Sequence, residues 1–457
     1  GNINKAIESG RQSAIRFVQA LADFSQPQRI YRDWFGRFEQ QAGRDIIIDR
    51  IALNNDSRLA DELLLARLQL QAGQAYTERS LRRGLRQLYG LDTFERISQQ
   101  LTTDEYGSTV LNVSAQEKSW GPGYANFRLM FEDDFRTTHL YQLAAAYTRT
   151  NLSEWGAEWR AELALGSNKY LGTELYWPLA GSGLYAQADY QHRRDVQALQ
   201  DSQQLSAGEL KNNQNALQLS AGWNISDHAR LQLGWTWRDG SYVLPGLYAQ
   251  QLGLKQFDYR RYGPQAQLIW DTLNSRSFPT RGIRLASSYR FLRDTALEQS
   301  IDSTSSSTEL LAAKSWMRHT LRTRWRFDHY NPKQDAGFAL EQFSLGGFLN
   351  LSGYAPDSLF GSQIQFGSLV YLYRLTEQKI SFFNAPLYFG TSLERGRVRK
   401  DVFGASGGAD ATNWLSAGSM FLGWDTPLGP LYFGVGIAEY GQSDYSDALY
   451  LSFGKSY

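Results

Sequence analysis

One stretch of the sequence has the spacing of a serine-hydrolase nucleophile. In G-A-S-G-G, Gly404–Gly408, the residues around Ser406 fit the pattern G-x-S-x-G. In hydrolases with this pattern the serine lies on a sharp turn, after a strand and before a helix. Here small and polar residues continue past Gly408, which is typical of a glycine-rich loop. We therefore predict no catalytic residue in this segment and no enzyme activity for this chain.

The other side chains that could do chemistry indicate no metal or redox site. The five histidines are scattered, and none stands at a metal-binding spacing with an aspartate or glutamate: His139, His192, His228, His319 and His329. Cysteine is absent, which excludes disulfides and thiolate ligands. Lys plus Arg number 47 against 46 Asp plus Glu, so the chain lacks the basic excess of a nucleic-acid-binding protein. We predict no metal, no cofactor and no nucleic-acid partner.

Five arginines lie on one face of two strand-like segments, R-G-I-R-L-A-S-S-Y-R-F (Arg281–Phe291) and T-L-R-T-R-W-R-F (Thr320–Phe327). We call them the basic ladder: Arg284, Arg290, Arg322, Arg324 and Arg326. Charges on one face cannot lie in a hydrophobic core without partners, but they can line a water-filled lumen. The ladder is either a conduit for a peptide or a solvated wall paired with carboxylates such as Glu132, Asp134 and Asp328. We favour the second interpretation.

The elements that position the basic ladder are strands, because the hydrophobic period is two from Gly121 onward. In A-L-Q-L-S-A-G-W, Ala216–Trp223, apolar residues alternate with Gln218, Ser220 and Gly222. The chain contains 13 Trp, 26 Tyr, 24 Phe and 41 Gly, a composition that favours strands and tight turns. No apolar run could form a transmembrane helix, whereas many segments approach the roughly 9–11 residues of a membrane-crossing strand. Tryptophans at strand ends are typical of the interfacial girdles of a membrane barrel: Trp177, Trp223, Trp237, Trp270, Trp414 and Trp424.

These segments predict a mainly β fold with a 16-stranded antiparallel transmembrane β-barrel over residues 119–457. The expected links alternate in length, as in bacterial outer-membrane barrels. Short periplasmic turns are predicted at Ala180, Ser226, Asn331, Thr376 and Asp425. Long outer loops are predicted at Val196–Lys211, Asp239–Gln256, Thr295–Leu311, Leu345–Ser362 and Glu394–Thr412, and the serine-rich run Asp302–Thr308 is expected to be a flexible loop tip.

The barrel must close on itself, because an open strand edge in lipid leaves backbone groups unpaired. The predicted seam joins the first strand, Y-A-N-F-R-L-M-F, to the last, A-L-Y-L-S-F-G-K-S-Y. Its side chains include Phe127 and Leu129 on the first strand, and Leu451 and Phe453 on the last.

Two further regions precede the barrel. Residues 1–43 are predicted to be a helical linker, with helical spacing in Ala14–Phe24. Residues 44–118 are predicted to form a small β-α-α-β-β unit. Asn55 or Asp56 is expected to cap its first helix, Thr77 is expected to cap its second, and Gly90 is expected to end the second.

From residue 44 to its end the chain resembles the outer-membrane barrels that carry periplasmic POTRA domains. This superfamily includes barrel-assembly factors, two-partner secretion transporters and patatin-like autotransporters. Two segments carry the resemblance: G-L-D-T-F-E-R-I, Gly90–Ile97, is similar to a POTRA signature, and W-D-T-L-N-S-R-S-F-P-T-R-G, Trp270–Gly282, is similar to a periplasmic turn between central strands. The resemblance implies one POTRA domain at 44–118, a barrel in the outer membrane of a Gram-negative cell, and a POTRA domain in the periplasm.

The resemblance also explains an unusual loop, L-G-G-F-L-N-L-S-G-Y-A-P-D-S, Leu345–Ser358, which is too apolar and too rich in glycine to face water. In this superfamily the sixth outer loop folds into the lumen and rests its tip on the inner wall. The corresponding residues here are Leu351, Ser352, Gly353 and Tyr354. The family tip usually carries an arginine where this chain has Ser352, so an arginine lock to the wall is not expected.

The departure at Ser352 resembles the patatin-like, type Vd autotransporter branch. Ala6–Ala14 also resembles the closing helix of a patatin-type lipase domain. We hypothesise a translocator that secretes or displays its own N-terminal phospholipase passenger, whose serine and aspartate would lie before residue 1. Its other implied partners are outer-membrane lipid and the barrel-assembly machinery during biogenesis. An assembly factor or two-partner transporter for separate clients, and a solute channel, are the alternatives.

Overall fold

The computed structural model describes residues 3–16, 27–32, 46–136, 139–180, 182–200, 206–246, 249–250, 253–334, 340–375, 385–399, 413–440 and 444–455. The chain divides into two compact units. One comprises Gly1–Asp56 with Leu65–Gln116, and the other comprises Ser57–Leu64 with Glu117–Tyr457. The predicted helix over Ala14–Phe24 lies mostly outside the described residues; the helix that is described, α1, runs earlier, over Ile3–Arg16.

The small unit is built on a three-stranded sheet in the order β2 (Arg50–Asp56), β5 (Thr109–Glu117), β4 (Phe94–Thr103), with β2 parallel to β5. Two helices accompany it, α4 (Asp61–Leu68) and α5 (Glu78–Tyr89). A separate strand pair, β1 (Ile46–Ile48) with β3 (Gln74–Tyr76), completes the unit. The second strand of that pair, β3, was not predicted, because three residues are too few to show the alternation of apolar and polar residues that marks a strand.

The ends of α5 follow the sequence prediction. Thr77 Oγ1 accepts the backbone N–H of Ser80 at 3.1 Å, and the N–H of Gly90 donates to Arg86 O at 2.9 Å. The predicted cap of α4 is wrong, because Asn55 and Asp56 belong to β2 and pair with β5. That sheet continues to Asp56, so the helix cannot begin before the chain has left it.

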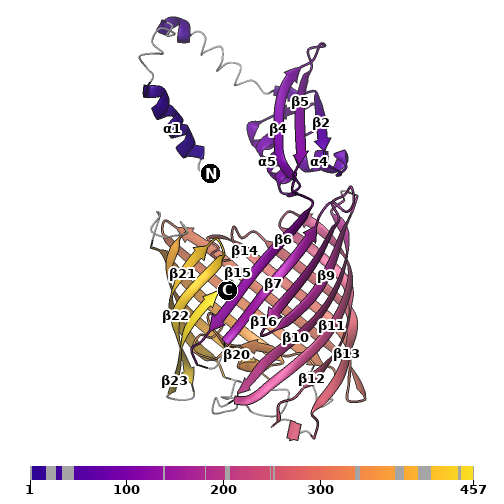
Figure 1. The fold of residues 1–457 in the computed structure, drawn as a ribbon, viewed down its shortest axis with the longest axis vertical. Coiled ribbons are helices and arrows are strands. Elements are labelled where there is room, and N and C mark those ends of the chain that lie inside the picture. The colour runs from indigo at the N-terminus through magenta and orange to yellow at the C-terminus, as the bar shows by residue number, and fades with distance from the viewer. Residues whose placement is uncertain are drawn as a thin grey trace. The chain divides into compact units, whose positions relative to one another are not determined.

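The large unit is a closed barrel of sixteen antiparallel strands (Figure 1), which confirms the predicted fold class. The strands are β6 (Gly123–Asp133), β7 (His139–Arg149), β8 (Glu158–Gly166), β9 (Lys169–Leu179), β10 (Leu184–Gln200), β11 (Ser206–Ser226), β12 (Ala229–Val243), β13 (Gln256–Asp271), β14 (Arg281–Ala296), β15 (Gln299–Trp316), β16 (His319–Pro332), β19 (Gln363–Arg374), β20 (Leu387–Arg399), β21 (Leu415–Thr426), β22 (Gly429–Tyr440) and β23 (Asp444–Phe453).

Alternate residues of these strands face outward and are apolar. Leu217, Leu219 and Leu233 are all exposed, whereas Gln232 and Thr236 on the opposite face are buried. Five of the six predicted girdle tryptophans are between 41% and 56% exposed: Trp177, Trp223, Trp237, Trp270 and Trp414. Such an apolar exterior is what lipid requires of a barrel strand. No helix of the described residues is long and apolar enough to cross a membrane.

We call the end of the barrel that connects β6 to β7 the loop end, and the other the turn end. At the loop end, residues 340–362 form the inserted hairpin, which contains the strand pair β17 (Phe343–Leu345) and β18 (Leu359–Gly361). The short turn predicted at Asn331 is wrong, because Asn331 ends β16 at the loop end and the long connection with the inserted hairpin follows it. The turn that was missed is Met317–Arg318, between β15 and β16.

The loop predicted over Thr295–Leu311 is also wrong. The strands β14 and β15 pair without interruption from Arg281–Lys314 to Ala296–Gln299. Only Leu297 and Glu298 connect them, both with positive φ. The run Asp302–Thr308 therefore lies in β15, where Ser303 and Ser305 are buried. Serine is small enough to face a crowded lumen, so its abundance did not indicate flexibility here.

Candidate functional site

The tip of the inserted hairpin, Leu349–Tyr354, is held on the inner wall by a buried carboxylate, Glu394 of β20. Glu394 Oε2 accepts the backbone N–H of Leu351 at 2.7 Å and that of Ser352 at 2.8 Å. Glu394 Oε1 accepts Ser352 Oγ at 2.8 Å and Ser392 Oγ at 2.5 Å. Glu394 is 4% exposed, and within the described ranges its partners are these donors and no cation. Three hydrogen bonds to Glu394 therefore hold the tip, and the fourth, from Ser392 of the same strand, orients the carboxylate.

The backbone of the tip is shaped to present those N–H groups. Leu349, Leu351 and Gly353 all have positive φ, at 54°, 75° and 106°. Successive N–H groups that converge on one oxygen form a backbone nest, which binds anions. A left-handed conformation at a residue other than glycine costs roughly 1–3 kcal/mol and persists only where its surroundings impose it. The tip therefore stores strain that its contacts with the wall must offset.

Two glycines allow the tip to lie directly on the wall. A Cβ at Gly436 of β22 would lie 2.7 Å from Ser352 Cβ and 2.9 Å from Gly353 N. A Cβ at Gly353 would meet Ala438 in the same way. Because neither atom exists, the backbone of the tip reaches hydrogen-bonding distance of the wall.

The strand β23 and the end of β22 hold the remaining polar groups of the tip. The N–H of Gly353 donates to Tyr450 Oη at 2.8 Å, and Ser446 Oγ donates to the carbonyl of Gly353 at 2.7 Å. Tyr354 Oη donates to the carbonyl of Glu439. The tip therefore contacts the inner wall from β20 to β23, the last strands of the barrel.

The other anchor of the hairpin is its root, Leu340–Gln342, which is held by ion pairs. Glu341 lies 2.9 Å from Arg261 of β13 and 2.8 Å from Arg290 of β14. Arg261, 3% exposed, also pairs with the fully buried Asp294 at 2.9 Å. Burial alone would raise the pKa of Glu341, but Arg261, Arg290 and Arg238 outweigh it and lower that pKa to about 2. Glu341 is therefore ionised at every physiological pH.

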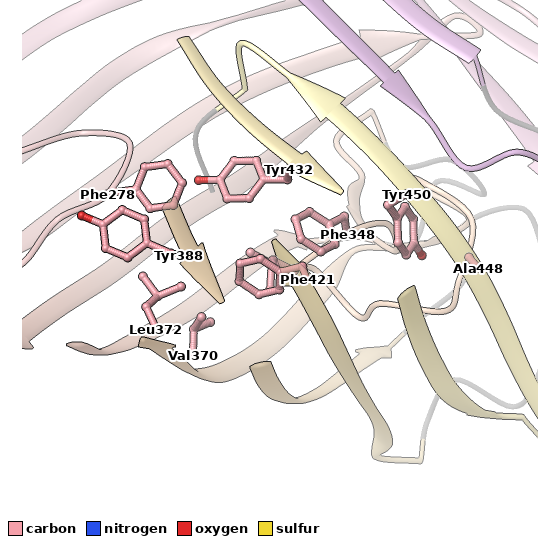
Figure 2. Close-up of a cluster of buried hydrophobic side chains, with 10 residues drawn as sticks. Phe278, Phe348, Val370, Leu372, Tyr388, Phe421, Tyr432, Ala448 and Tyr450 are labelled. Carbon is pink, nitrogen blue, oxygen red and sulfur yellow. The ribbon is translucent and has the colours of Figure 1, made fainter. Parts of the chain in front are cut away.

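An aromatic cluster connects the inserted hairpin to the turn between β13 and β14 (Figure 2). Phe348 of the hairpin lies 5.2 Å from Phe421, 5.6 Å from Tyr432 and 5.4 Å from Tyr450 between ring centroids. Phe278, from the turn, stacks at 4.9 Å on Tyr388 and at 5.2 Å on Tyr432.

The turn that carries Phe278 belongs to the segment Trp270–Gly282. Asn274 Oδ1 accepts the N–H groups of Thr280 and Arg281, each at 3.0 Å, which fixes the shape of the turn. Phe278 is 2% exposed and contacts β20 and β22, although the turn joins β13 to β14. The turn therefore reaches across the bore from the turn end and meets the side chains that surround Phe348.

The basic ladder lies in the lumen and forms ion pairs. Arg284 and Arg324 share Glu309, at 3.3 Å and 2.6 Å, and Arg326 pairs with Asp328 at 2.5 Å. Arg290 pairs with Glu341 in the root, and Arg322, 4% exposed, interacts with Tyr432. Of the other carboxylates named from the sequence, Glu132 pairs with Lys455 at 2.5 Å and Asp134 accepts the N–H of Arg136.

The inserted hairpin does not fill the bore. A cavity of about 980 Å³ remains beside it, with Arg284, Arg324 and Arg326 on one side and Gly346 and Phe348 on the other. Since its lining is rich in charge, the cavity is suited to water and to polar chain segments rather than to lipid.

A search for known families decides what kind of barrel this is. The Omp85 superfamily domain matches residues 151–457. The chain belongs to the Omp85 superfamily. It is therefore an outer-membrane barrel, as the sequence predicted. No curated protein sequence matches the chain.

Solved structures of similar fold are consistent with the Omp85 assignment. BamA from Haemophilus ducreyi lacking POTRA domains 1–3 is 14% identical, covers 90% of this chain and 85% of its own, and superposes with a TM-score of 0.64. CdiB from Acinetobacter baumannii is 12% identical, covers 89% of this chain and 74% of its own, and has a TM-score of 0.54. CdiB from Escherichia coli is 11% identical, with 90% and 76% covered and the same TM-score of 0.54. These likenesses concern the fold.

The seam of this Omp85 barrel is short. On β23, Leu451, Ser452 and Phe453 pair with Asp133, Glu132 and Phe131 of β6, and the described register extends no further. Phe127 and Leu129, which the sequence placed at the seam, pair with β7 and are 78% and 53% exposed.

A glycine ends the seam. Gly454 has φ +76°, and a Cβ there would collide with the carbonyl of Leu129. The N–H of Gly454 donates to Pro430 O of β22 at 2.8 Å, while its backbone lies directly against Leu129 of β6. Residues 123–130 of β6 thus have no partner on β23 within the described register.

The remaining sequence candidates add no site. His139 contacts Asp133 at 2.7 Å, His192 contacts Asn215 at 2.9 Å, and His319 contacts Tyr371 at 2.6 Å. Among the residues that the structure describes, no cluster of His, Asp and Glu could hold a metal ion. Ser406 lies outside the described residues, so its exclusion as a nucleophile stays a prediction.

Sequence reasoning missed Glu394, Ser392 and Phe278. Glu394 stands in S-L-E-R-G, where Leu393 faces out and Glu394 faces in, like any other polar lumen residue of a strand. The available signal was an inward carboxylate in the strand that follows the apolar loop Leu345–Ser358. Phe278 lay in a segment treated as a turn, where an aromatic residue followed by proline is an inconspicuous feature.

Proposed function

We propose that this Omp85 barrel is a translocator that secretes or displays its own N-terminal passenger, a patatin-like phospholipase. The observation that carries the proposal is the inserted hairpin, which crosses the bore and is anchored at both ends. A simple solute channel has no need of a hairpin whose backbone is strained at Leu349 and Leu351. A protein that must stay closed until a chain arrives needs an obstruction that can be released.

The two anchors and the short seam give the passenger a path. Release of the tip from Glu394 would widen the bore, and separation of the three seam pairs would open the wall beside β6. Both steps replace hydrogen bonds within the barrel by hydrogen bonds to the arriving chain, so their net cost is modest. We propose that residues 44–118 are one POTRA domain in the periplasm, whose sheet edge receives the passenger by β-augmentation.

The patatin-like passenger is supported by two features of the sequence. Ser352 stands where the family tip has an arginine, and Ala6–Ala14 falls within α1. The phospholipase serine and aspartate are expected before residue 1. A decisive observation is the upstream reading frame, where G-x-S-x-G between a strand and a helix would establish the passenger.

The experiment that tests translocation deletes residues 44–457 from the full-length gene and measures lipase activity on intact cells. We expect surface activity to be lost while activity in lysates persists. Unchanged surface activity would refute the role.

A disulfide across the seam between β6 and β23 tests the proposed path of the passenger. Since the chain has no cysteine, Phe131→Cys with Phe453→Cys can form a disulfide across directly paired residues, given that paired positions lie within bridging distance. We expect display to fall until reductant is added. The matched control, Leu143→Cys with Leu165→Cys, staples β7 to β8 and should leave display unchanged.

A second candidate is an assembly factor or two-partner transporter that acts on separate clients, which the similarity in fold to BamA and CdiB favours. Depletion of the chain would then lower many outer-membrane proteins or a separately encoded exoprotein. The proposed translocator predicts that only its own passenger leaves the surface. A solute channel predicts steady conductance in planar bilayers with the inserted hairpin in place.

A further inference from the structure

A second cavity, of about 320 Å³, lies on the wall formed by β8 to β13. The tip of the inserted hairpin lies on β20 to β23, so this is a different part of the bore. Its lining contains five glutamines: Gln187, Gln191, Gln218, Gln232 and Gln267. We call this surface the glutamine groove.

The strand register gathers these glutamines on one face. Gln218 of β11 stands beside Asp189 of β10 and Thr236 of β12, and Gln232 of β12 stands beside Gln267 of β13. Side chains directly opposite across antiparallel strands lie about 4.5–5.5 Å apart, so Gln232 and Gln267 are neighbours and Gln218 lies between Asp189 and Thr236. Polar side chains thus follow one another from β10 to β13, as an elongated ligand would require.

The charged residues of the groove balance. Arg160, Arg230 and Arg238 face Glu162, Glu174 and Asp189, which gives three positive and three negative groups. Arg160 already pairs with Glu162 at 2.8 Å. A groove with no net charge neither attracts nor repels a charged ligand strongly, so its selectivity must come from hydrogen bonds.

Some of the glutamine amides already form hydrogen bonds within the barrel, and others can bond to a ligand. Gln232 Nε2 donates to Ser220 Oγ at 2.5 Å, and Gln187 Nε2 donates to Asp189 at 3.1 Å. Gln218 and Gln267 make no side-chain hydrogen bond with any other described residue. A glutamine amide offers one carbonyl and one NH₂ group, the same donor and acceptor chemistry as a peptide group.

We infer that the glutamine groove binds the backbone of an extended polypeptide of any sequence. Because each amide can serve either a backbone N–H or a backbone C=O, successive residues of a moving chain would find equivalent contacts. This inference rests on the proposed function, for which it names the contact surface of the passenger inside the barrel.

An oligosaccharide is the other elongated, uncharged ligand, and the groove suits it less well. Sugar sites need an open aromatic face, but Tyr170 carries the guanidinium of Arg193 at 5.6 Å from its ring centroid. The tryptophans of these strands, Trp223, Trp235 and Trp237, are exposed on the outer face. The other tyrosine of the lining, Tyr190, stands opposite the outward-facing Leu217, so the rest of the lining is mainly amide and charge.

The test measures binding of a fluorescent 12-residue Gly-Ser-Thr peptide to the purified full-length chain by anisotropy. We expect Gln218→Leu with Gln267→Leu to weaken binding about fivefold or more, since two amide hydrogen bonds are lost. The same peptide with N-methylated backbone amides should bind more weakly to the unaltered chain and lose little further affinity in the double variant. Gln142→Leu, a half-buried glutamine of β7 outside the groove, is the matched control and should change nothing.

Three results would overturn the inference: affinity unchanged in the double variant, equal loss in Gln142→Leu, or displacement of the peptide by maltohexaose. Heat-modifiable mobility on gels checks that each variant is a folded barrel, and Gln218→Met with Gln267→Met repeats the measurement should the leucine variant unfold. Failure of the inference can be told apart from failure of the proposed function. Surface display of the passenger can be intact even if the peptide does not bind the glutamine groove.

Discussion

Glu341 at the root of the inserted hairpin and Glu394 at its tip are both carboxylates removed from water, but their partners differ in kind. The root carboxylate faces Arg261 and Arg290, whereas the tip carboxylate faces two backbone N–H groups and two serine hydroxyls. Coulomb attraction falls slowly with distance, while a hydrogen bond weakens steeply once its length and angle depart from the optimum. The root can therefore move slightly and keep its ion pairs with Arg261 and Arg290. The tip either fits the wall or is released.

This contrast assigns different roles to the two ends. A tether should tolerate movement, and the ion pairs of the root meet that requirement. A release point should change state cooperatively, and the strained nest of the tip, with Leu349 and Leu351 at positive φ, has that character. Among the described residues, the tip is thus held without a cation, by contacts that are either made together or lost together.

The largest effect is expected from Gly436→Val. A side chain there would overlap Ser352 Cβ and Gly353 N of the tip and the ring of Tyr450, of which Gly353 N is backbone that cannot move aside without moving the tip. The tip should leave the wall entirely, while the root stays bound. Hydrogen exchange with mass spectrometry should show full loss of protection in peptides containing Leu351–Gly353. Gly246→Val, in the connection after β12, is the control, because a Cβ there would meet no atom of the described residues within 4 Å.

The next effect is expected from Glu394→Ala. Removal of the carboxylate leaves the buried N–H groups of Leu351 and Ser352 unsatisfied, and each unsatisfied group costs about 1–3 kcal/mol. Glu394→Gln keeps the shape and one acceptor, so its loss of protection at the tip should be smaller. Equal effects of the two variants would mean that the charge itself, and not the hydrogen-bond geometry, holds the tip.

The sequence predicted much of this arrangement for identifiable reasons. Alternation of large apolar residues with polar ones fixed the inner and outer faces, and the apolar, glycine-rich Leu345–Ser358 indicated a loop that packs on a wall. The β14–β15 turn escaped prediction because Leu297 and Glu298 adopt positive φ without glycine or asparagine. A turn without glycine or asparagine, followed by the serine-rich run Asp302–Thr308, has the composition of a flexible loop.

The anchors could not be predicted, because each joins residues far apart in the chain. Glu394 lies 42 residues from Ser352, Glu341 lies 51 residues from Arg290, and Leu340 beside it lies 79 residues from Arg261. Whether an inward carboxylate meets a cation, a nest or water depends on which loop the barrel folds over it. Composition and periodicity contain no such information.

A smaller effect is expected from Phe278→Leu, which tests whether the turn between β13 and β14 supports the tip. Leucine retains most of the volume but loses two aromatic contacts, with Tyr388 and Tyr432, worth about 0.5–1.5 kcal/mol each. Since Phe348 shares Tyr432 with Phe278, exchange at the tip should rise modestly while exchange at the root is unchanged. A rise at the root instead would show that the cluster serves both anchors.

The smallest effect at the tip is expected from Glu341→Gln, because that change acts at the root, where the lowered pKa of Glu341 corresponds to roughly 3 kcal/mol of charge stabilisation. The pKa of Glu341 is lowered from its ordinary 4.5 to about 2, so its charge stabilises the folded root at every pH above 4.5. That contribution is lost as the pH falls from 4.5 through 2. Labelling of Leu340→Cys by a pyridyl disulfide, which reacts in acid, should therefore be faster in the glutamine variant between about pH 5 and about pH 7. The two rates should converge near pH 2. A difference that persists to pH 2, or that grows there, would show that the root is held by shape and not by charge, and the contrast between the two anchors would disappear.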